Sequence, residues 1–592
     1  MLQPKNTRSC YNHHMNYGNL ELIKDIWHFL KPYKKRFFIG TFLRLTSDIV
    51  WLFPPWAISE IINFATKYSW GNDLTYFWKL IVTVWIVALY HIITHDLAKF
   101  IIYPIGERMA LDSILETNRH MFSLDSEWHE KENSGNKIKR MNRGAVSLDV
   151  MIRLYIELII ESSVNIIGII IVLSSLGSRI DLILIFFFVT YFIISLLLTK
   201  KAGEQSHKTN IQQEEFDGLD FEAINNISTI KSLGIAKSIM HILKNSAERV
   251  YKEIKLRIFW FRTRSAALNI YREIFRQILI FYVAWNVFQG NLEVGTIALA
   301  LLYFEKISSS ASEFSEFSNE FVLSRIAMMR LKDILKVEPK TETSGTKKFN
   351  PHWKTMSTKN LTFSYGGRKI LNNLNLKIKR GEKVGIVGIS GTGKSTLFKL
   401  LLKLYENYEG EILFDNQTLR DTIRKSYLES VSYVPQETEL FNFSLKENII
   451  LSDPNSFQRG HGPSAQQAKN LALPVLSAAS LTKNKSRFEK AIEISHVSDF
   501  LHKLPKGVNS LIGEKGIKLS GGERQRVGIA RAIYKNPEIL FMDEATSHLD
   551  VESEKKIQEA LHHFFKGITA LVIAHRLSNL REMDRILVIS AG

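Results

Sequence analysis

The stretch GISGTGKST at residues 388–396 has the residue types and spacing of a phosphate-binding loop. Its glycines allow backbone N–H groups to turn inward around phosphate oxygens at a helix N-terminus. Lys394 places a positive charge beside the β- and γ-phosphates, and Ser395 offers its hydroxyl to magnesium. The apolar run VGIV precedes the loop and TLFKLLLKLY follows it, so the context is strand, loop and helix. The predicted nucleotide-binding residues of the loop are Gly388, Ser390, Gly391, Gly393, Lys394, Ser395 and Thr396.

Two acidic residues end the apolar run ILFMDE at residues 539–544. The run is typical of a buried strand, so Asp543 lies at the strand end and Glu544 follows it. Asp543 is placed to hold magnesium, directly or through water, and Glu544 is placed to polarise an attacking water as a general base. Without a phosphate loop in the chain, the two residues would be interpreted as solvated acids.

The octapeptide LSGGERQR at residues 519–526 is a second candidate anion site. A serine and paired glycines ahead of a helix provide another helix N-terminus with free N–H groups. One nucleotide does not need two phosphate-binding helix ends in one chain. Two chains facing each other head to tail would use both, each completing the site of the other.

The elements that must position these residues divide the 592-residue chain into at least two domains. From about residue 355 onward, short β-like runs, glycine turns and amphipathic helices alternate. The predicted organisation is a polar tail (1–20), a transmembrane domain (21–335), a linker (336–354) and a nucleotide-binding domain (355–592).

The first half contains apolar runs of membrane-spanning length. Residues 182–199 form an uncharged run of eighteen residues, and the apolar run 162–178 lies just upstream. At 1.5 Å per residue such runs nearly cross a hydrocarbon core about 30 Å thick, so we expect a helical hairpin in the membrane. Four weaker runs complete six predicted spans, namely 37–63, 77–103, 266–289 and 295–318.

The distribution of charge supports six spans with a cytosolic N-terminus. The inner loop 200–264 holds twelve Lys or Arg residues, whereas the three outer loops hold only Lys67 and Arg179. This positive-inside asymmetry explains the formal net charge of +18 without nucleic acid as a partner. The two inner loops, 104–151 and 200–264, keep helical periodicity, so the spanning helices are expected to continue into the cytosol.

Several ionisable residues fall near mid-membrane by their distance from the ends of the spans. Such groups are costly toward lipid and usually face a bundle interior or a wet cavity. They indicate a polar translocation pathway, with Asp48, Glu161 and Glu305 as its candidate residues, or ion pairs between helices, or a position outside the membrane where the helices extend into the cytosol. The complete set is Asp48, Glu161, Glu273, Arg276, Glu305 and Lys306.

The N-terminal tail gives little sign of chemistry. The single cysteine, Cys10, excludes an internal disulfide, and the first twenty residues lack the apolar core of a signal peptide. The segment CYNHH at 10–14 has metal-capable side chains without a second cluster, so a polar tail is the favoured interpretation.

The motifs together resemble those of ATP-binding cassette (ABC) transporters of the exporter type, in the form of a half-transporter, over residues 21–592. FSY supplies Tyr365, similar to the aromatic residue that stacks on adenine. VPQE supplies Gln436, which matches the residue that contacts magnesium and the membrane domain. IAHRLS supplies His575, which matches the switch histidine at the γ-phosphate. The fold class implied is a six-span α-helical domain fused to an α/β P-loop domain, the type I exporter architecture.

The resemblance also implies the cofactors and further site residues. ATP and Mg²⁺ are expected, with Ser395, Gln436 and Asp543 on the metal. Ser520 and Gly522 are assigned to the γ-phosphate of the partner chain's ATP. The whole signature is Leu519, Ser520, Gly521, Gly522 and Glu523. Ser547 and Asp550 match the dimer-interface loop, and LIGEKG at 511–516 resembles the segment that touches the coupling helices.

Three features depart from the family pattern. His548 occupies a position of the dimer-interface loop where the family usually has a small residue. Residues 456–487 resemble an insertion in the helical subdomain, for which a surface loop is favoured over a regulatory element. The chain stops at ILVISAG, where the family continues through another strand and helices, which is expected of a fragment.

The function implied is ATP-driven export, or flipping, of a lipid, drug or peptide-like substrate by alternating access. A homodimer in the cell (inner) membrane, with cytosolic nucleotide-binding domains, is the simplest assembly, and a heterodimer with a second half-transporter also fits. A soluble cassette ATPase is disfavoured by the membrane hairpin, and an ATP-gated channel by the presence of Glu544 and His575. An importer is disfavoured by the fusion of both domains in one chain.

Overall fold

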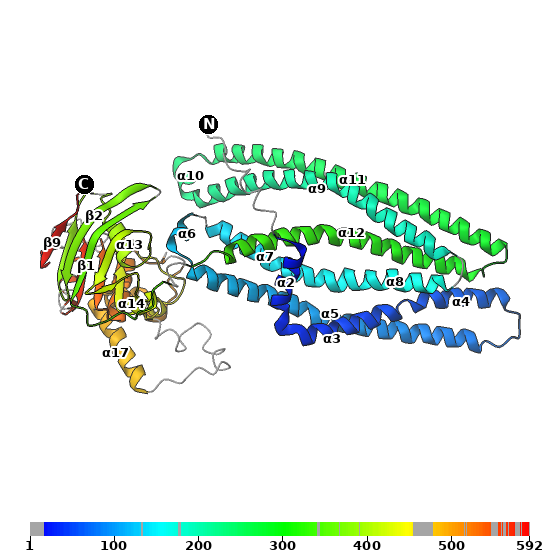
Figure 1. Cartoon of the computed structure of the whole chain (residues 1–592), viewed down its shortest axis with the longest axis horizontal. Helices are drawn as coiled ribbons and strands as arrows, with labels where there is room; N and C mark the ends of the chain where they lie inside the picture. Colours follow the sequence, from blue (N-terminus) through cyan, green and yellow to red (C-terminus); the bar gives the residue numbers. More distant parts are fainter. Residues whose placement is uncertain are drawn as a thin grey trace. The chain divides into compact units, whose positions relative to one another are not determined.

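The computed structural model describes residues 17–131, 134–175, 179–339, 344–365, 367–389, 391–453, 478–513, 516, 518–545, 554–557, 559, 564–565, 567–574, 580–581 and 583–590. The chain divides into two compact units (Figure 1). The first comprises Met1–His120 and Gly135–Lys336, and the second comprises Met121–Ser134 and Val337–Gly592.

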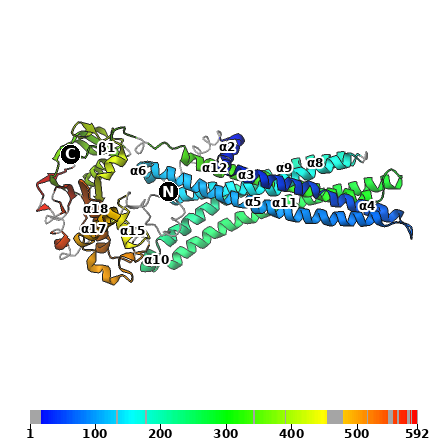
Figure 2. The same cartoon turned by 90° about the horizontal axis from the view of Figure 1, so that it is seen from below.

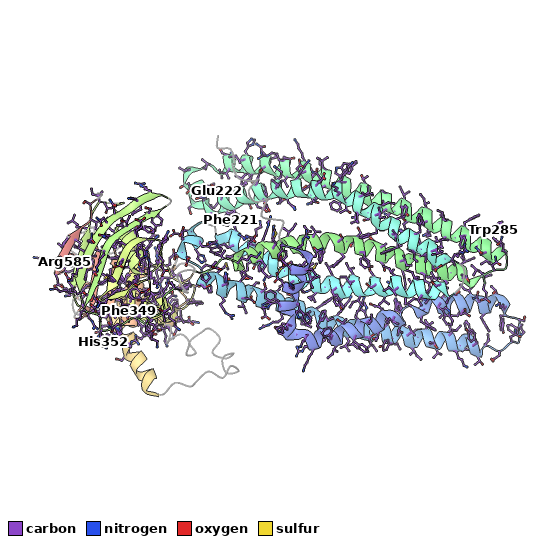
Figure 3. All side chains as sticks on the ribbon, viewed as in Figure 1. Phe221, Glu222, Trp285, Phe349, His352 and Arg585 are labelled. Atoms are coloured by element: carbon purple, nitrogen blue, oxygen red, sulfur yellow. The ribbon has the colours of Figure 1, made fainter. Side chains whose placement is uncertain are left out.

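The described part of the first unit is built from helices. They are α2 (Asn19–Leu30), α3 (Lys34–Val50), α4 (Phe53–Lys67), α5 (Thr75–Ser123), α7 (Ser134–Leu154), α8 (Ile160–Ser174), α9 (Ile180–Asn225), α10 (Ile227–Leu233), α11 (Ala236–Phe288) and α12 (Gly295–Leu335). Helices α9 and α11 lie side by side (Figures 1 and 2), and the short α10 joins them at one end. Figure 3 shows Trp285 near the opposite end of this pair from Phe221 and Glu222. Helix α12 packs against α4, α8, α9 and α11.

Four helical stretches of the described chain are long and apolar enough to cross a membrane. They are Asn19–Lys67, Thr75–Ser123, Ser134–Ser174 and Ile180–Asn225. The predicted spans 266–289 and 295–318 correspond to α11 and α12, which are 53 and 41 residues long but are not among these four. On α5, Trp85 and Phe100 are 68% and 78% exposed, as expected of side chains that face lipid.

The predicted span 37–63 is broken between α3 and α4. Pro54 and Pro55 lie in the first turn of α4, where their missing N–H groups cost nothing, but a proline cannot continue the preceding helix. The carbonyl groups freed by the break are bonded by α12, because Lys306 Nζ donates to Trp51 O at 2.9 Å and Tyr303 Oη donates to Leu52 O at 2.9 Å. Lys306 therefore donates a hydrogen bond to a backbone carbonyl group that the end of α3 leaves without a helical partner.

The second unit contains two sheets. An antiparallel sheet has the order β2-β1-β4-β5, and a parallel sheet has the order β6-β7-β8-β3-β9. The strands are β1 (Thr355–Tyr365), β2 (Arg368–Lys379), β3 (Lys383–Val387), β4 (Glu409–Phe414), β5 (Gln417–Thr418), β6 (Val431–Val434), β7 (Ile539–Asp543), β8 (Thr569–Ile573) and β9 (Arg585–Val588). Every residue of β7 and β8 is buried, as parallel strands require when both faces of the sheet are covered.

Helices complete this unit. They are α6 (Ser126–Lys131), α13 (Lys394–Leu401), α14 (Arg424–Glu429), α15 (Leu445–Ile450), α17 (Ala478–Ile494) and α18 (Gly521–Lys535), with 3₁₀ turns at Ser498–Lys503 and Gly507–Asn509. The predicted linker is partly built into the unit, since Phe349 and Trp353 are 6% and 1% exposed and belong to its core. The inner-loop helix α6 also belongs here, where Glu130 pairs with Lys399 of α13 at 3.2 Å.

Candidate functional site

The phosphate loop connects β3 to α13. Gly393, the residue before α13, has φ +92°, and a Cβ there would lie 2.8 Å from Leu371 Cδ2. At Gly388 a Cβ would lie 2.2 Å from the carbonyl oxygen of Ile589. Only glycine fits both positions. Helix α13 has no side-chain cap at its N-terminus, so its first N–H groups are available to an anion.

Lys394 and Ser395 open α13 in different environments. Lys394 is 5% exposed, and its Nζ donates to the carbonyl oxygens of Gly388 at 2.9 Å and Ile389 at 3.0 Å. The ammonium group is therefore held over the loop. Ser395 is exposed and Thr396 is half-buried, so the Ser395 hydroxyl is accessible from solvent.

Asp543 and Glu544 differ sharply in burial and conformation. Asp543 ends β7 and is 3% exposed. Glu544 has φ +49°, a left-handed conformation that costs energy in a non-glycine residue and is typical of functional sites. Its backbone N–H donates to Ile573 O of the neighbouring strand at 3.0 Å, which fixes this turn.

Two residues in and just after β6, Tyr433 and Gln436, contact these acids. Gln436 Nε2 donates to Glu544 Oε2 at 3.0 Å. Tyr433 donates a hydrogen bond to Asp543, and burial followed by this carboxylate raises the pKa of Tyr433 to about 12. Because β6, β7, β8 and β3 are parallel, the phosphate loop, Gln436 and the two acids follow strand ends at one edge of the sheet.

The signature begins α18 and has its own cap. The Ser520 side chain accepts from the Glu523 N–H, and the Glu523 carboxylate accepts from the Ser520 N–H at 2.8 Å. Burial acts to raise the pKa of Glu523, but the hydrogen bonds from Ser520 outweigh it and lower the pKa. Leu519 is buried at 4% exposure, and its carbonyl accepts from Arg524 Nη1 at 2.8 Å.

The two helix N-termini belong to different hydrophobic cores. Leu397 and Phe398 of α13 lie in the core between the two sheets. Val527 and Ile529 of α18 lie in the core shared with α15 and α17. The phosphate loop and the signature are thus anchored in separate parts of the second unit.

Tyr365 ends β1 beside other aromatic rings. Its ring packs edge-on against Phe363 at 4.8 Å and Tyr405 at 5.6 Å between centroids. Several predicted residues lie outside the described part of the chain, namely Ser390, Ser547, His548, Asp550 and His575. Of the predicted insertion, residues 456–477 also lie outside it, and residues 478–487 form the first part of α17.

The mid-membrane acids form two separate groups. Arg44 joins Asp48 and Glu161, with Nε 2.9 Å from Asp48 Oδ2 and Nη2 2.5 Å from Glu161 Oε2. Glu305 instead pairs with Arg276 at 3.6 Å. The Arg44–Glu161 and Arg276–Glu305 contacts join different helices, whereas Arg44 and Asp48 lie on one helix.

The sequence analysis did not single out Arg44, Tyr433 or Glu130. Arg44 stands four residues before Asp48, the spacing of a helical ion pair, which could have signalled it. Tyr433 lies on β6, which ends two residues before Gln436. Glu130 had no signal, because its partner Lys399 is 269 residues away.

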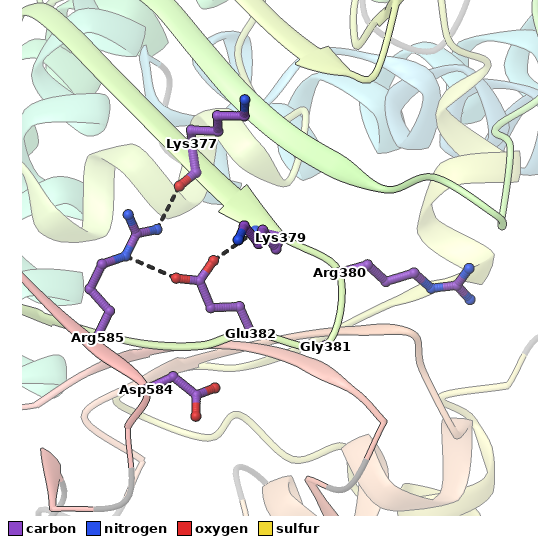
Figure 4. A pocket seen from close by; sticks show the side chains of 7 residues that line it. All are labelled: Lys377, Lys379, Arg380, Gly381, Glu382, Asp584 and Arg585. Atoms are coloured by element: carbon purple, nitrogen blue, oxygen red, sulfur yellow. Dashed lines mark hydrogen bonds and ion pairs between the residues drawn. The ribbon is translucent and has the colours of Figure 1, made fainter.

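A polar pocket away from the predicted nucleotide site lies between β2 and β9 (Figure 4). The Arg585 guanidinium group already has two partners within the pocket. Its Nε lies 2.9 Å from Glu382 Oε1, and its Nη2 donates to Lys377 O at 2.5 Å. The Lys379 N–H donates to Glu382 Oε2 at 2.7 Å. None of the predicted nucleotide-binding residues lines this pocket.

Comparisons with known proteins match both halves of the chain. The family described as "ABC transporter transmembrane region" matches residues 37–311, and the family "ABC transporter" matches residues 371–547. Heavy metal tolerance factor 1 of Caenorhabditis elegans is 28% identical over 500 residues, which covers 83% of this chain and 58% of that protein. A putative export ATP-binding/permease protein of Rickettsia bellii is 28% identical over 502 residues, which covers 83% of this chain and 82% of that protein.

One solved structure shares the fold over nearly the whole chain. It is a bacterial Atm1-family ABC exporter with ATP bound, with a TM-score of 0.79 and 22% sequence identity. The match covers 94% of this chain and 93% of that chain.

Proposed function

Because the chain belongs to the ABC transporter family, with the transmembrane and ATP-binding domains of an exporter in one polypeptide, we propose that it uses ATP hydrolysis to export or flip a substrate. The proposed working unit is a dimer that buries two nucleotides between phosphate loop and signature. The substrate is proposed to be a lipid, a drug or a peptide-like molecule. The protein is proposed to lie in the cell (inner) membrane, with the nucleotide-binding domain in the cytosol.

The observation that carries this proposal is the separation of the phosphate loop from the signature within the second unit. The N-termini of α13 and α18 are anchored in different hydrophobic cores; α13 follows the glycine loop, and α18 begins with the two glycines of the signature. A second chain placed head to tail would bring its signature to the phosphate loop of the first. Both ends would then act on one nucleotide, which neither chain provides alone.

The residues present fit magnesium and the phosphates of ATP. The uncapped N-terminus of α13, the positive charge of Lys394 and the accessible Ser395 hydroxyl suit a triphosphate. Asp543 and Gln436 supply the oxygen ligands that Mg²⁺ prefers. When bound, the metal would be held by Ser395, Gln436 and Asp543 and would neutralise the negative charge that develops on the phosphate oxygens.

The side chains at the sheet edge have distinct proposed tasks. Glu544 accepts a proton from the attacking water. Gln436 orients the Glu544 carboxylate through the hydrogen bond from Gln436 Nε2 to Glu544 Oε2. Tyr433 holds Asp543 in place for the metal. By the resemblance, His575 contacts the γ-phosphate, Tyr365 stacks on adenine, and Ser547 and Asp550 line the dimer interface.

Helix α6 offers a path for coupling. Lys399 lies on α13, which starts at the phosphate loop, and it pairs with Glu130 of the inner loop. Burial acts to raise the pKa of Glu130, but hydrogen bonds from Tyr405 and Lys399 lower it, so the carboxylate is charged at neutral pH. We propose that this contact carries motion from the phosphate loop to the long helices.

The experiment that tests the function is ATP hydrolysis by the purified full chain in lipid, wild type against Glu544→Gln. We expect hydrolysis to fall at least about a hundredfold in the variant, since a general base contributes roughly 10²–10⁴-fold, while ATP binding persists. Glu411→Gln, an exposed residue of β4, is the matched control and should hydrolyse ATP normally. Equal rates in Glu544→Gln and wild type would contradict the proposed base.

A heterodimer with a second half-transporter is the alternative assembly. An inactive wild type that gains activity only with another half-transporter chain would favour it. Hydrolysis by the chain alone favours the homodimer.

A further inference from the structure

Two histidines on α5 face a buried carboxylate on α3 in the first unit. His91 and His95 are four residues apart, so both lie on one side of the helix. Asp48 is 3% exposed, and one ligand atom from each of the three residues lies within 4.8 Å of the others. The side-by-side course of α3 and α5 is visible in Figures 1 and 2.

The hydrogen bonds of His91 define its tautomer. The Ser47 hydroxyl donates its hydrogen to the backbone oxygen of His91, with Oγ and O 3.2 Å apart. Ser47 Oγ can therefore accept a hydrogen bond from His91 Nδ1, which lies 2.9 Å away. Nδ1 is also 3.2 Å from the backbone oxygen of Ser47, which can only accept. Nδ1 therefore carries the proton and Nε2 has the lone pair, the arrangement in which a backbone carbonyl orients a metal-binding histidine.

His95 and Asp48 share one cation, Arg44. Arg44 Nη1 contacts both ring nitrogens of His95, Nδ1 and, at 2.9 Å, Nε2, and one of these nitrogens accepts from it. Arg44 Nε lies 2.9 Å from Asp48 Oδ2, and its side chain is 1% exposed. The guanidinium group thus occupies the place where imidazole nitrogen and carboxylate oxygen converge.

We propose that Asp48, His91 and His95 form a binding site for a first-row transition-metal dication such as Zn²⁺. Two imidazoles and a carboxylate are a common ligand set for these ions, at about 2.0–2.2 Å, and leave a fourth position for water. Hard cations such as Mg²⁺ and Ca²⁺ prefer all-oxygen sites and are excluded. The ion would tie α3 to α5.

Arg44 does not have to leave the bundle when the metal binds. Glu161 of α8 already holds Nη2 at 2.5 Å, so Arg44 can release Asp48 and His95 and keep a carboxylate partner. Lys306 is held nearby by the carbonyl oxygen of Trp51 at 2.9 Å. Arg44 is therefore a competitor of the metal, which gives the proposal a specific signature: removing the Arg44 charge must strengthen binding.

The test is a Co²⁺ titration of the metal-stripped full chain in lipid nanodiscs, followed by its visible ligand-field bands. We expect one Co²⁺ per chain, displaced by Zn²⁺. His91→Ala, His95→Ala and Asp48→Asn should each weaken binding at least about tenfold, and Arg44→Gln should strengthen it by about tenfold. His28→Ala, an exposed histidine on α2, is the control and should bind as wild type does.

Binding unchanged in the His91→Ala, His95→Ala double variant would overturn the proposal, as would weaker binding in Arg44→Gln. X-ray absorption of the Zn²⁺-loaded wild type keeps the test decisive if a variant fails to fold. Two imidazole ligands and oxygen are expected. A sulfur ligand would place the ion at Cys10, the single cysteine of the chain, and overturn the site.

Discussion

At the scale of residues, the predicted nucleotide site is built from backbone requirements that the sequence displays. Gly388 and Gly393 stand where a Cβ would collide, and glycine is the only residue type that fits. The hydrogen bond between Gln436 and Glu544 joins two segments 108 residues apart, and no sequence spacing predicts such a distance. Motifs with a local cause were therefore predictable, whereas partners brought together by folding were not.

Gly393→Ala should weaken nucleotide binding while the chain still folds. The left-handed conformation costs about 1–2 kcal/mol in alanine, and the new Cβ would press on Leu371. Gly367→Ala is the matched control, because Gly367 has φ +90° with nothing within 4 Å of a Cβ. Fluorescent nucleotide titration should show at least about a tenfold loss of affinity for Gly393→Ala only. Equal losses in both variants would mean that backbone strain alone is responsible.

At the scale of elements, the strands and helices of the second unit follow the hydrophobic pattern, and the breaks follow prolines. Pro54 and Pro55 signalled the end of α3, but the predicted span 37–63 ran through them and so missed the division into two helices. The linker 336–354 looked polar, and its core residues Phe349 and Trp353 became evident only once β4 and α14 were placed around them.

Tyr303→Phe should destabilise the first unit by about 1–3 kcal/mol, because the buried carbonyl of Leu52 loses its donor. The thermal unfolding midpoint in lipid nanodiscs measures this change. Tyr251→Phe, at an exposed position of α11, should leave the midpoint unchanged. A midpoint unaffected by Tyr303→Phe would show that the hydrogen bond from Tyr303 to Leu52 O does not stabilise the break between α3 and α4.

The cap of α18 should depend on pH through Glu523. Its folded pKa is lowered, so its contribution to stability is present above its ordinary value of about 4.5 and is lost as pH falls through the folded pKa. Ser520→Ala should cost about 1 kcal/mol at neutral pH. In Glu523→Gln, the loss of stability that the wild type shows on acidification through Glu523 should vanish. Unfolding midpoints between pH 3 and 7 measure this loss. If the unfolding midpoint of Glu523→Gln falls with pH as steeply as that of the wild type, other carboxylates are responsible for the acid-induced loss of stability.

At the scale of the whole molecule, the fold class was predictable and is confirmed by the matches to both ABC transporter domains. The order of motifs in the second half and the apolar runs in the first half each point to one architecture. The specific pairing of Arg44 with Glu161 was not predictable, because the two residues are 117 positions apart and meet only when α3 packs on α8.

The α6 contact should matter for coupling more than for stability, since an exposed ion pair contributes only about 0–1 kcal/mol. Glu130→Lys should leave basal ATP hydrolysis within about twofold and reduce its response to a transported substrate. Combining Glu130→Lys with Lys399→Glu should restore the response in liposomes. Failure of the charge exchange to restore it would remove this pair from the coupling path.

The most direct test of the two-chain nucleotide site is complementation between two inactive chains. Lys394→Ala removes the phosphate loop's charge, and Ser520→Arg blocks the signature, so neither variant should hydrolyse ATP alone. Co-expressed and reconstituted together, they should recover about a quarter of the wild-type rate, because half of the dimers are mixed and each mixed dimer keeps one intact composite site. No recovery in verified mixed dimers would contradict the account, since it would mean that each chain uses its own loop and its own signature.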